Sequence, residues 1–207
     1  MVILYLIRHA ESEANAKRIL ASRLAFPLTE AGRAEADLIA SQLKSMATID
    51  RIVSSPLPRA MQTAEAFRKH FGVPIEEDGR LAEQELGAFS GLSYDEVKTI
   101  PDYEQDPMAR WDWVPRGGGE SYRMMASRVR DFFAALEQRP EGERILVVTH
   151  AVTFRLIRGL LERTLPAYPK SFPNNGEIWK VEFRDLGTRH PIESILLGNS
   201  CKYAHNP

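Results

Sequence analysis

The chain has 207 residues, 43% of them hydrophobic, and its 27 basic and 28 acidic side chains leave a formal net charge of −1. This length and composition suit one globular domain with a sizeable core. The balanced charge excludes a general nucleic-acid-binding surface and a basic membrane-binding surface, so any cluster of arginines has to be a local site.

The first third of the chain alternates between strand and helix patterns. Residues 2–7 are continuously apolar, which predicts a strand buried on both faces. The run is too short for the hydrophobic region of a signal peptide or for a membrane span. Thr29 can cap a helix that begins at Glu30, and helical spacing relates its residues Ala31, Ala34, Leu38, Ile39 and Gln42–Leu43.

A second strand and helix follow. Residues 51–54 predict a short strand, and Ser55-Pro56 opens a helix that Gly72 and Pro74 end. The apolar face of this helix is predicted to contain Ala60, Ala64, Phe67 and Phe71.

The middle of the chain is irregular. From about residue 79 to residue 119 the periodicity is poor and Gly, Pro, Asp and aromatic residues are frequent, which predicts a lid-like insertion. A long helix resumes near Ser121, with an apolar face formed by Tyr122, Met125, Val129, Phe132 and Leu136. Residues 145–149 predict another buried strand, which ends directly at His150, and residues 151–161 predict a further helix.

The last part of the chain contains two more predicted strands. Residues 177–183 alternate, with Trp179, Val181 and Phe183 on one side, and residues 192–197 follow. The single cysteine, Cys201, excludes an intrachain disulfide and suits a reducing compartment. We therefore expect a cytoplasmic protein with neither a nucleic acid nor a membrane as partner, and a homodimer is left open.

Together these elements predict an α/β fold. Strands that alternate with helices imply a three-layer sandwich, in which a mostly parallel sheet is covered by helices on both faces. Residues 1–207 would form one domain with the insertion at about 79–119. Ligands of such sheets bind beyond the carboxyl ends of the strands.

Cationic and imidazole side chains follow three of the predicted strands. Arg8 and His9 follow the first strand, Arg59 lies five residues past Ser54, and His150 follows a later strand. Cations that meet at one edge of a sheet repel one another unless an anion is present, and planar guanidinium groups suit phosphate oxygens. A neutral imidazole beside a bound phosphate can accept its phosphoryl group, and the arginines make a metal ion unnecessary.

Several blocks resemble the motifs of the histidine phosphatase superfamily, which includes the cofactor-dependent phosphoglycerate mutases. LIRHAESEAN resembles its Arg-His-Gly-Glu signature, SSPLPRAMQTAE its second block and VVTHAVTFRLI its second-histidine block. RLAEQELGAFSG is similar to the segment that bears the family's acid/base glutamate, and PLTEAGRAEA and GGGES also fit. The blocks occur in the family's order and cover most of the chain.

The resemblance implies roles for individual residues. His9 would be the nucleophile, and Arg8, Arg59, His150 and Asn15 would bind the phosphate. Glu83, four residues before Gly87, would be the proton donor. Its rival Glu85 is expected to be solvated. Glu11 would hold the local loop by a hydrogen bond.

The chain departs from the family pattern at several positions. Alanine replaces the usual glycine after both histidines, at Ala10 and Ala151, and each adds a Cβ atom where backbone can pass close to the phosphate. Ser22 and Ala25 stand where the family usually carries a glycine and an aspartate. These departures bear on substrate fit and rate.

The resemblance implies a metal-independent phosphomonoesterase of the histidine acid phosphatase type, which acts on a small phosphorylated molecule through a phosphohistidine on His9 and needs no cofactor. A phosphoglycerate-type mutase is the alternative with the same chemistry. A non-catalytic phosphate-binding sensor or scaffold stays open, whereas a metal site at His9, Glu11 and His150 is disfavoured by the neighbouring arginines. In the insertion, Trp111, Trp113, Arg110 and Arg116 either contact the substrate or anchor the insertion to the core.

Overall fold

The computed structural model describes residues 1–198, so Cys201 lies outside the described residues. Its centre is a six-stranded mixed sheet with the order β3-β2-β4-β1-β5-β6. The strands are β1 Val2–Arg8, β2 Arg51–Ser54, β3 Ile75–Glu77, β4 Arg144–Thr149, β5 Ile178–Phe183 and β6 Glu193–Leu196. Strands β1 to β4 are mutually parallel, whereas β5 and β6 are antiparallel to their neighbours. The predicted α/β fold is therefore confirmed.

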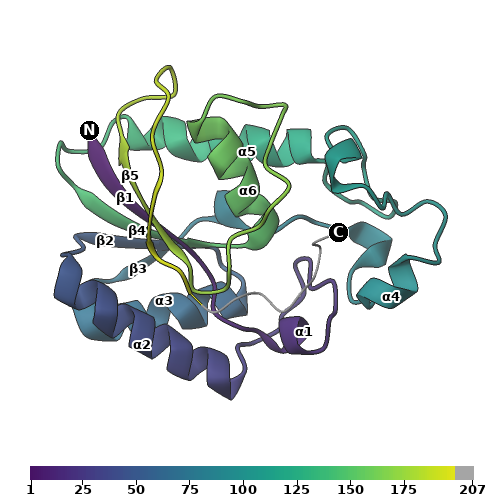
Figure 1. Cartoon of the computed structure of the whole chain (residues 1–207), viewed down its shortest axis with the longest axis horizontal. Coiled ribbons are helices and arrows are strands. Elements are labelled where there is room, and N and C mark those ends of the chain that lie inside the picture. Colours follow the sequence, from purple (N-terminus) through teal and green to yellow (C-terminus); the bar gives the residue numbers. More distant parts are fainter. Residues whose placement is uncertain (199–207) are drawn as a thin grey trace.

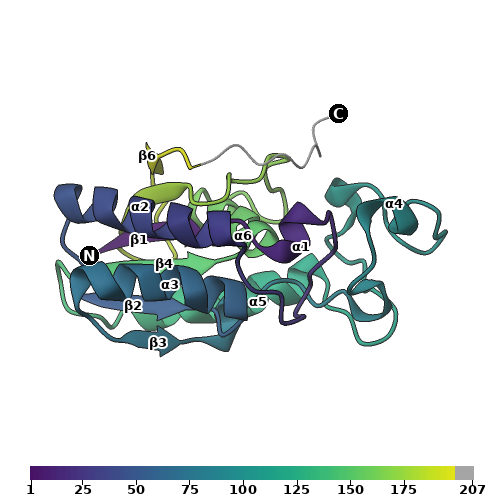
Figure 2. The same cartoon turned by 90° about the horizontal axis from the view of Figure 1, so that it is seen from below.

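Helices cover both faces of the sheet (Figures 1 and 2). Helices α2 (Glu30–Met46) and α3 (Pro58–Phe71) lie on one face, and α5 (Tyr122–Leu136) and α6 (Ala151–Leu161) lie on the other. Alternate residues of β1 point to opposite faces of the sheet. Leu4 and Leu6 belong to the apolar cluster on one face, and Tyr5 and Ile7 belong to the cluster on the other. This burial on both faces explains the continuous apolar run that opens the chain.

The buried face of α2 differs from the predicted one. Thr29 caps the helix as expected, through a hydrogen bond from the Gly32 amide to its hydroxyl. The residues that it buries, however, are Gly32, Ala36, Ile39, Ala40 and Leu43, while Ala31, Ala34 and Leu38 are exposed. Gly32 lies on the buried face because the backbone of Glu11 packs directly against Gly32 and leaves no room for a Cβ atom.

Other boundaries were partly predicted. Helix α3 begins at Pro58, two residues after Ser55-Pro56, and ends at Gly72 in a left-handed conformation. The expected apolar faces of α3 and α5 are the ones that pack inward, with Phe71 only half-buried. The short helix α1 (Glu13–Ala16) and strand β3 had no counterpart in the sequence pattern because each is too brief to show a period.

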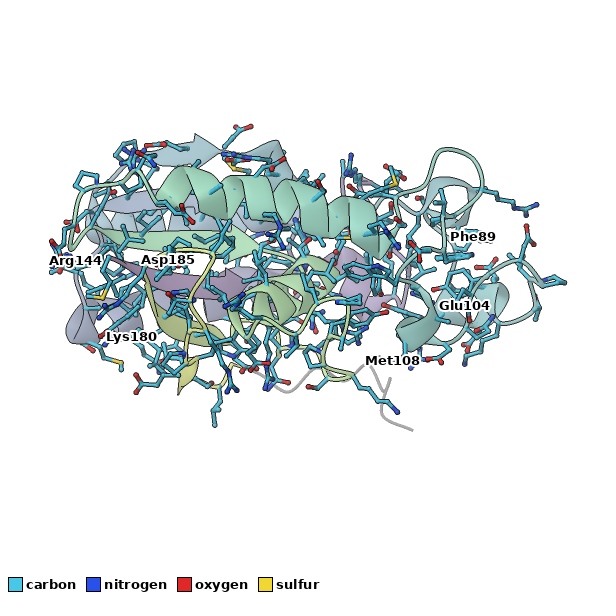
Figure 3. All side chains as sticks on the ribbon, turned by 90° about the horizontal axis from the view of Figure 1, so that it is seen from above. Phe89, Glu104, Met108, Arg144, Lys180 and Asp185 are labelled. Atoms are coloured by element: carbon cyan, nitrogen blue, oxygen red, sulfur yellow. The ribbon has the colours of Figure 1, made fainter. Side chains whose placement is uncertain are left out.

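Residues 79–119, which we call the insertion segment, contain little regular structure. They form the 3₁₀ turns Gly79–Leu81, Gly87–Phe89 and Pro107–Ala109 and the short helix α4 (Tyr94–Val97). A small apolar cluster, in which Phe89 and Tyr103 pack with Leu20 from outside the segment, holds much of the segment together. It projects at one end of the molecule, where Phe89, Glu104 and Met108 lie, opposite the end marked by Arg144 and Asp185 (Figure 3).

No helix within residues 1–198 is both long enough and apolar enough to cross a membrane.

Candidate active site

The two histidines meet because β1 and β4 are parallel neighbours. Arg8 pairs with Thr149 in their register, so His9 and His150 leave the sheet at the same level. Their ring centroids are 5.1 Å apart. The amide of His9 also donates to the carbonyl of Thr149 over 3.0 Å, which extends the pairing by one residue. The two histidines therefore lie together at the carboxyl edge of the sheet, as predicted.

The imidazole of His9 has a defined tautomer. Its Nδ1 atom lies 2.7 Å from the carbonyl oxygen of Ala10, which can only accept a hydrogen bond. Nδ1 therefore carries the hydrogen, and Nε2 keeps its lone pair. Burial, together with the charges of Arg59 and Arg8, holds the pKa of His9 well below its usual value, so the ring is neutral near pH 7. A neutral imidazole with a bare Nε2 is the form that can attack phosphorus.

Two buried arginines flank His9. Arg8 ends β1 and donates from Nη1 to the carbonyl of Pro173 over 2.7 Å. Arg59, in the first turn of α3, is 1% exposed and donates to the carbonyls of Ser22 and Leu24 over 2.7 and 3.2 Å. Burial lowers the pKa of Arg59 to about 10, which leaves it cationic near pH 7. Backbone carbonyls hold both guanidinium groups, and Arg59 has no carboxylate partner within hydrogen-bond range among residues 1–198.

Asn15 belongs to a capped turn beside His9. Its Oδ1 accepts hydrogen bonds from the amide and the hydroxyl of Ser12, over 3.1 and 2.8 Å, and so closes the first turn of α1. Because the oxygen is used in this turn, the amide nitrogen is the group that Asn15 can offer to a ligand. Asn175 approaches the same oxygen at 3.5 Å and donates to the carbonyl of His9 over 2.7 Å.

Glu11 has the local role that was expected. Its carboxylate accepts from the Thr29 hydroxyl over 2.9 Å, and its carbonyl accepts from the Thr29 amide over 3.0 Å. Glu11 thus ties the loop after β1 to the start of α2.

Glu83 lies at the start of α6. Its carboxylate accepts hydrogen bonds from the backbone amides of Val152 and Thr153 over 3.1 and 3.3 Å. These amides belong to the first turn of α6, directly after His150, where helix N–H groups have no partner within the helix. The proton-donor candidate and the second histidine are therefore positioned by the same helix end.

A partly buried group of three charged side chains holds the backbone of Glu83. Arg128 of α5 donates to both carboxylate oxygens of Glu120 over 2.7 and 2.9 Å, and Arg23 contacts the same carboxylate at 3.1 Å. Both arginines also reach the carbonyl of Glu83, over 3.4 and 3.3 Å. Sequence reasoning missed this role. The block GGGES contains Glu120, but nothing in its spacing indicates what it would bond.

Glu85, the rival of Glu83, occupies a different environment. It does not line the cavity, and its Oε1 accepts from the Gly87 amide and from the hydroxyls of Ser22 and Ser90, all within 3.2 Å. The Glu85 side chain is 29% exposed, so the expected solvation is partial, and the same carboxylate holds the insertion segment to the loop that contains Ser22.

His150 is more deeply placed than its neighbour. It is 0% exposed, and its Nε2 lies 2.7 Å from the hydroxyl of Ser55, a contact that the sequence did not predict. It is absent from the residues of the described chain that line the cavity. Burial and the charge of Arg59 keep the pKa of His150 well below its usual value. Near pH 7 the positive charge of the free site therefore comes from the arginines rather than from His150.

One cavity of about 310 Å³ connects these groups. The predicted residues Arg8, His9, Asn15, Arg59 and Glu83 all line it. Within residues 1–198 the structure groups no three His, Cys, Asp or Glu side chains in a way that could hold a metal ion, so the trio His9, Glu11 and His150 is not assembled.

The departures from the family pattern have different structural consequences. Ala10 is fully buried and its methyl group joins the apolar cluster beneath α2 and α3, away from the cavity. Ala151 lines the cavity. Ser22 adopts a φ of 47°, a left-handed conformation that favours glycine, and its hydroxyl donates to the carbonyl of Gln84 over 3.0 Å. That side-chain bond compensates for some of the backbone strain.

The tryptophans of the insertion segment anchor it. Trp111 stacks on Tyr168 at 6.3 Å between ring centroids, and Trp113 packs against Phe89 and Tyr103 at 5.9 and 5.5 Å. Arg116 pairs with Asp102 at 3.2 Å on the surface. Arg110 alone of these four lines the cavity.

A segment that the sequence did not single out closes the site. Ser171, Phe172 and Asn174, just before β5, line the cavity, and Asn175 and Pro173 fix His9 and Arg8 as described. They arrive there because β5 is antiparallel to β1, so the chain that enters β5 begins where β1 ends. The sequence does not reveal the direction of β5 in the sheet, and for this reason the role of this segment was not predicted.

A family model confirms the resemblance. Residues 4–190 match the model described as histidine phosphatase superfamily (branch 1). The chain belongs to the histidine phosphatase superfamily. The match includes both histidine blocks and the block that contains Glu83.

Relatives of this superfamily member carry two kinds of name. Phosphoglycerate mutase-like protein 4 of Arabidopsis thaliana is 35% identical over 167 residues, which are 79% of this chain and 71% of the relative. Phosphoserine phosphatase 1 of Hydrogenobacter thermophilus is 34% identical over 159 residues, covering 75% of this chain and 74% of the relative. The relatives are thus named as phosphatases and as mutases.

Solved structures show the same fold. YhfR of Bacillus stearothermophilus superposes with a TM-score of 0.81 at 27% identity, covering 96% of this chain and 98% of that one. A mycobacterial glucosyl-3-phosphoglycerate phosphatase gives a TM-score of 0.80 at 24% identity, covering 96% and 99%.

Proposed function

We propose that this superfamily member is a metal-independent phosphomonoester hydrolase that works through a phosphohistidine on His9. The observation that carries this proposal is the bare Nε2 of a neutral His9 in a cavity walled by two buried, cationic arginines. A phosphate monoester could accept hydrogen bonds from Arg8 and Arg59, and this would bring its phosphorus within reach of Nε2.

The reaction follows from these groups in two steps. In the first, Nε2 of His9 forms a bond to phosphorus while the bond to the leaving oxygen breaks, and Glu83 gives that oxygen a proton. The Nδ1–H group keeps its hydrogen bond to the Ala10 carbonyl, and this hydrogen bond stabilises the positive charge of the phosphorylated ring. In the second, water attacks phosphorus, Glu83 takes a proton from the water, and phosphate leaves Nε2. The arginines stabilise charge on the phosphoryl oxygens in both steps.

Hydrolysis of p-nitrophenyl phosphate tests the proposal. Wild-type protein should turn this ester over equally with and without EDTA, because arginines supply the positive charge. Denaturation during turnover should leave an acid-labile phosphoryl group on His9. His9→Ala should retain its fold and lose turnover. Normal turnover in this variant would contradict the mechanism, and activity lost to EDTA and restored by zinc would favour metal catalysis.

A mutase is the second candidate, favoured by the names of several relatives. A mutase returns the phosphoryl group to a second hydroxyl and must hold a bisphosphate in between. The short stretch after Glu83 leaves little machinery for this. Incubation with 3-phosphoglycerate should therefore release inorganic phosphate. Efficient interconversion of the 2- and 3-phospho isomers would instead assign the mutase, and binding of phosphate without either reaction would assign a sensor.

A further inference from the structure

The side chain of Ser55 reaches His150 from the end of a neighbouring strand. Strand β2 pairs with β4, and the Ser55 amide continues this pairing by donating to the carbonyl of Val148 over 3.0 Å. Ser55 and His150 are both 0% exposed, and the Ser55 Oγ atom lies 2.7 Å from Nε2 of His150. The two-step reaction described above assigns no role to this buried contact.

The hydrogen bonds of Ser55 determine the direction of the contact. The Leu57 amide donates to Ser55 Oγ over 3.3 Å, so the hydroxyl group accepts from the backbone. In the described chain, Nε2 of His150 is then the acceptor for the hydroxyl hydrogen. The reverse arrangement, with Nε2–H donating to Oγ, would bury that hydrogen without an acceptor, which is unfavourable. Ser55 therefore donates to Nε2.

This direction places the one ring hydrogen of His150 on Nδ1. Burial and the charge of Arg59 hold the pKa of His150 well below its usual value, so the ring is neutral near pH 7 and carries a single N–H group. The Nδ1 atom is buried and has no hydrogen-bond partner among residues 1–198. A buried donor without a partner is rare in native proteins and indicates an acceptor that binds there.

The neighbouring ring indicates which acceptor this is. The ring of His9 lies 5.1 Å from that of His150, between centroids, and a phosphoryl group on His9 would bring anionic oxygens beside His150. A lone pair on Nδ1 would repel these oxygens, whereas an Nδ1–H group would donate to one of them. A neutral His150 is therefore useful to the site in only one of its two tautomers.

We propose that Ser55 is a positioning residue that holds His150 in the Nδ1–H tautomer, so that this ring presents a hydrogen-bond donor to the phosphoryl group. The benefit to the phosphoryl group rests on the proposed hydrolase function. The tautomer is a property of the free protein and can be measured without a substrate.

Long-range ¹H–¹⁵N NMR spectra distinguish a protonated ring nitrogen from a bare one. Near pH 7 the free wild type should show a protonated Nδ1 and a bare Nε2 for His150, whose signals are assigned among the five histidines by their loss in His150→Gln. Ser55→Ala should shift both nitrogens towards the averaged values of exchanging tautomers. Ser55→Thr keeps the hydroxyl group and should keep the wild-type pattern.

Kinetics test the consequence for the phosphoryl group. Ser55→Ala should slow phosphoenzyme formation from p-nitrophenyl phosphate about tenfold and weaken vanadate inhibition by a similar factor, as expected for the loss of one hydrogen bond. Ser55→Thr should restore most of both. Ser54→Ala is the matched control, because Ser54 is also 0% exposed but its hydroxyl donates to the Ser55 carbonyl over 2.9 Å. It should leave the His150 tautomer and turnover unchanged.

The outcomes separate this proposal from the hydrolase. An Nε2–H tautomer in the free wild type would overturn the role of Ser55, whatever the activity, and so would an unchanged tautomer in folded Ser55→Ala. A changed tautomer with wild-type vanadate inhibition and phosphoenzyme formation would overturn the donor role. If Ser55→Ala does not fold, the wild-type spectrum and Ser55→Thr decide. A protein with the Nδ1–H tautomer that hydrolyses no ester would overturn the hydrolase but not the control of the tautomer by Ser55.

Discussion

Glu83 is held by two amides of α6, while its backbone carbonyl is held by Arg23 and Arg128. This double attachment fixes the carboxyl group relative to His9. Helix α6 begins directly after His150, whose ring centroid lies 5.1 Å from that of His9. A carboxyl group so constrained can protonate a leaving oxygen without first being reoriented.

Glu83→Gln tests the acid role through the leaving group. An alkyl phosphate expels a strongly basic alkoxide, so phosphoenzyme formation should fall by roughly 10²–10⁴-fold. p-Nitrophenyl phosphate expels a stabilised phenolate and should lose much less. The first step has to be followed by rapid quench, because the proposed mechanism also uses Glu83 as the base of the second step. Equal losses for the two esters would remove Glu83 from the acid role.

Glu85→Gln is the matched control for that measurement. Glutamine keeps the Oε1 acceptor that binds the Gly87 amide and the hydroxyls of Ser22 and Ser90. Phosphoenzyme formation should therefore change little with either ester. A selective loss with alkyl phosphates in this variant would mean that the wrong glutamate was chosen. Thermal unfolding of both variants separates these effects from loss of structure.

At the scale of elements, the loop after β1 depends on the start of α2. The Glu11 backbone passes against Gly32, and Thr29 bonds both the carbonyl and the carboxylate of Glu11. The loop that carries Asn15 is thus positioned by α2, and this contact requires a residue without a side chain at Gly32.

Gly32→Ala should destabilise the protein by about 1–3 kcal/mol of unfolding free energy, because the added Cβ overlaps the Glu11 carbonyl. It should also weaken inhibition by vanadate, since the displaced loop carries Asn15. Gly79→Ala is the control, because no heavy atom lies within 4 Å of its Cβ position. Denaturant unfolding measures both variants, and equal stabilities would contradict the close packing of this loop.

The meeting of His9 and His150 was predictable because parallel strands share one carboxyl edge, and short apolar runs ending in charged residues mark that edge. The buried face of α2 was not, since alanines carry little hydrophobic signal and the contact with Glu11 involves backbone only. The insertion segment has no period, so neither the cavity position of Arg110 nor the contacts of Arg23 and Arg128 with the Glu83 carbonyl could be predicted from the sequence.

At the scale of the whole molecule, buried histidines couple stability to pH. Burial is the first cause that lowers the pKa of His9, His150 and His190 in the folded protein. In the unfolded chain these rings take up protons near pH 6.5, so between that pH and the lower folded pKa values the unfolded state binds more protons. Stability therefore falls as the pH decreases below about 6.5.

Thermal unfolding between pH 7.5 and pH 5 should show this decrease. His190→Gln removes one of the three rings at a distance from the cavity, and the glutamine oxygen can still accept from the Arg184 amide. The decrease in melting temperature on acidification should be smaller in this variant. A melting temperature independent of pH over this range would contradict burial of neutral histidines.

The antiparallel position of β5 beside β1 has a consequence for the order of synthesis. Strand β1 is made before both of its partners in the sheet, β4 and β5, which begin at Arg144 and Ile178. His9, the proposed nucleophile, thus leaves the ribosome long before the segments that surround it in the folded protein. Contacts of such long range slow folding, and a nascent chain that stops before Ile178 would lack both a neighbour of β1 and the segment that closes the site.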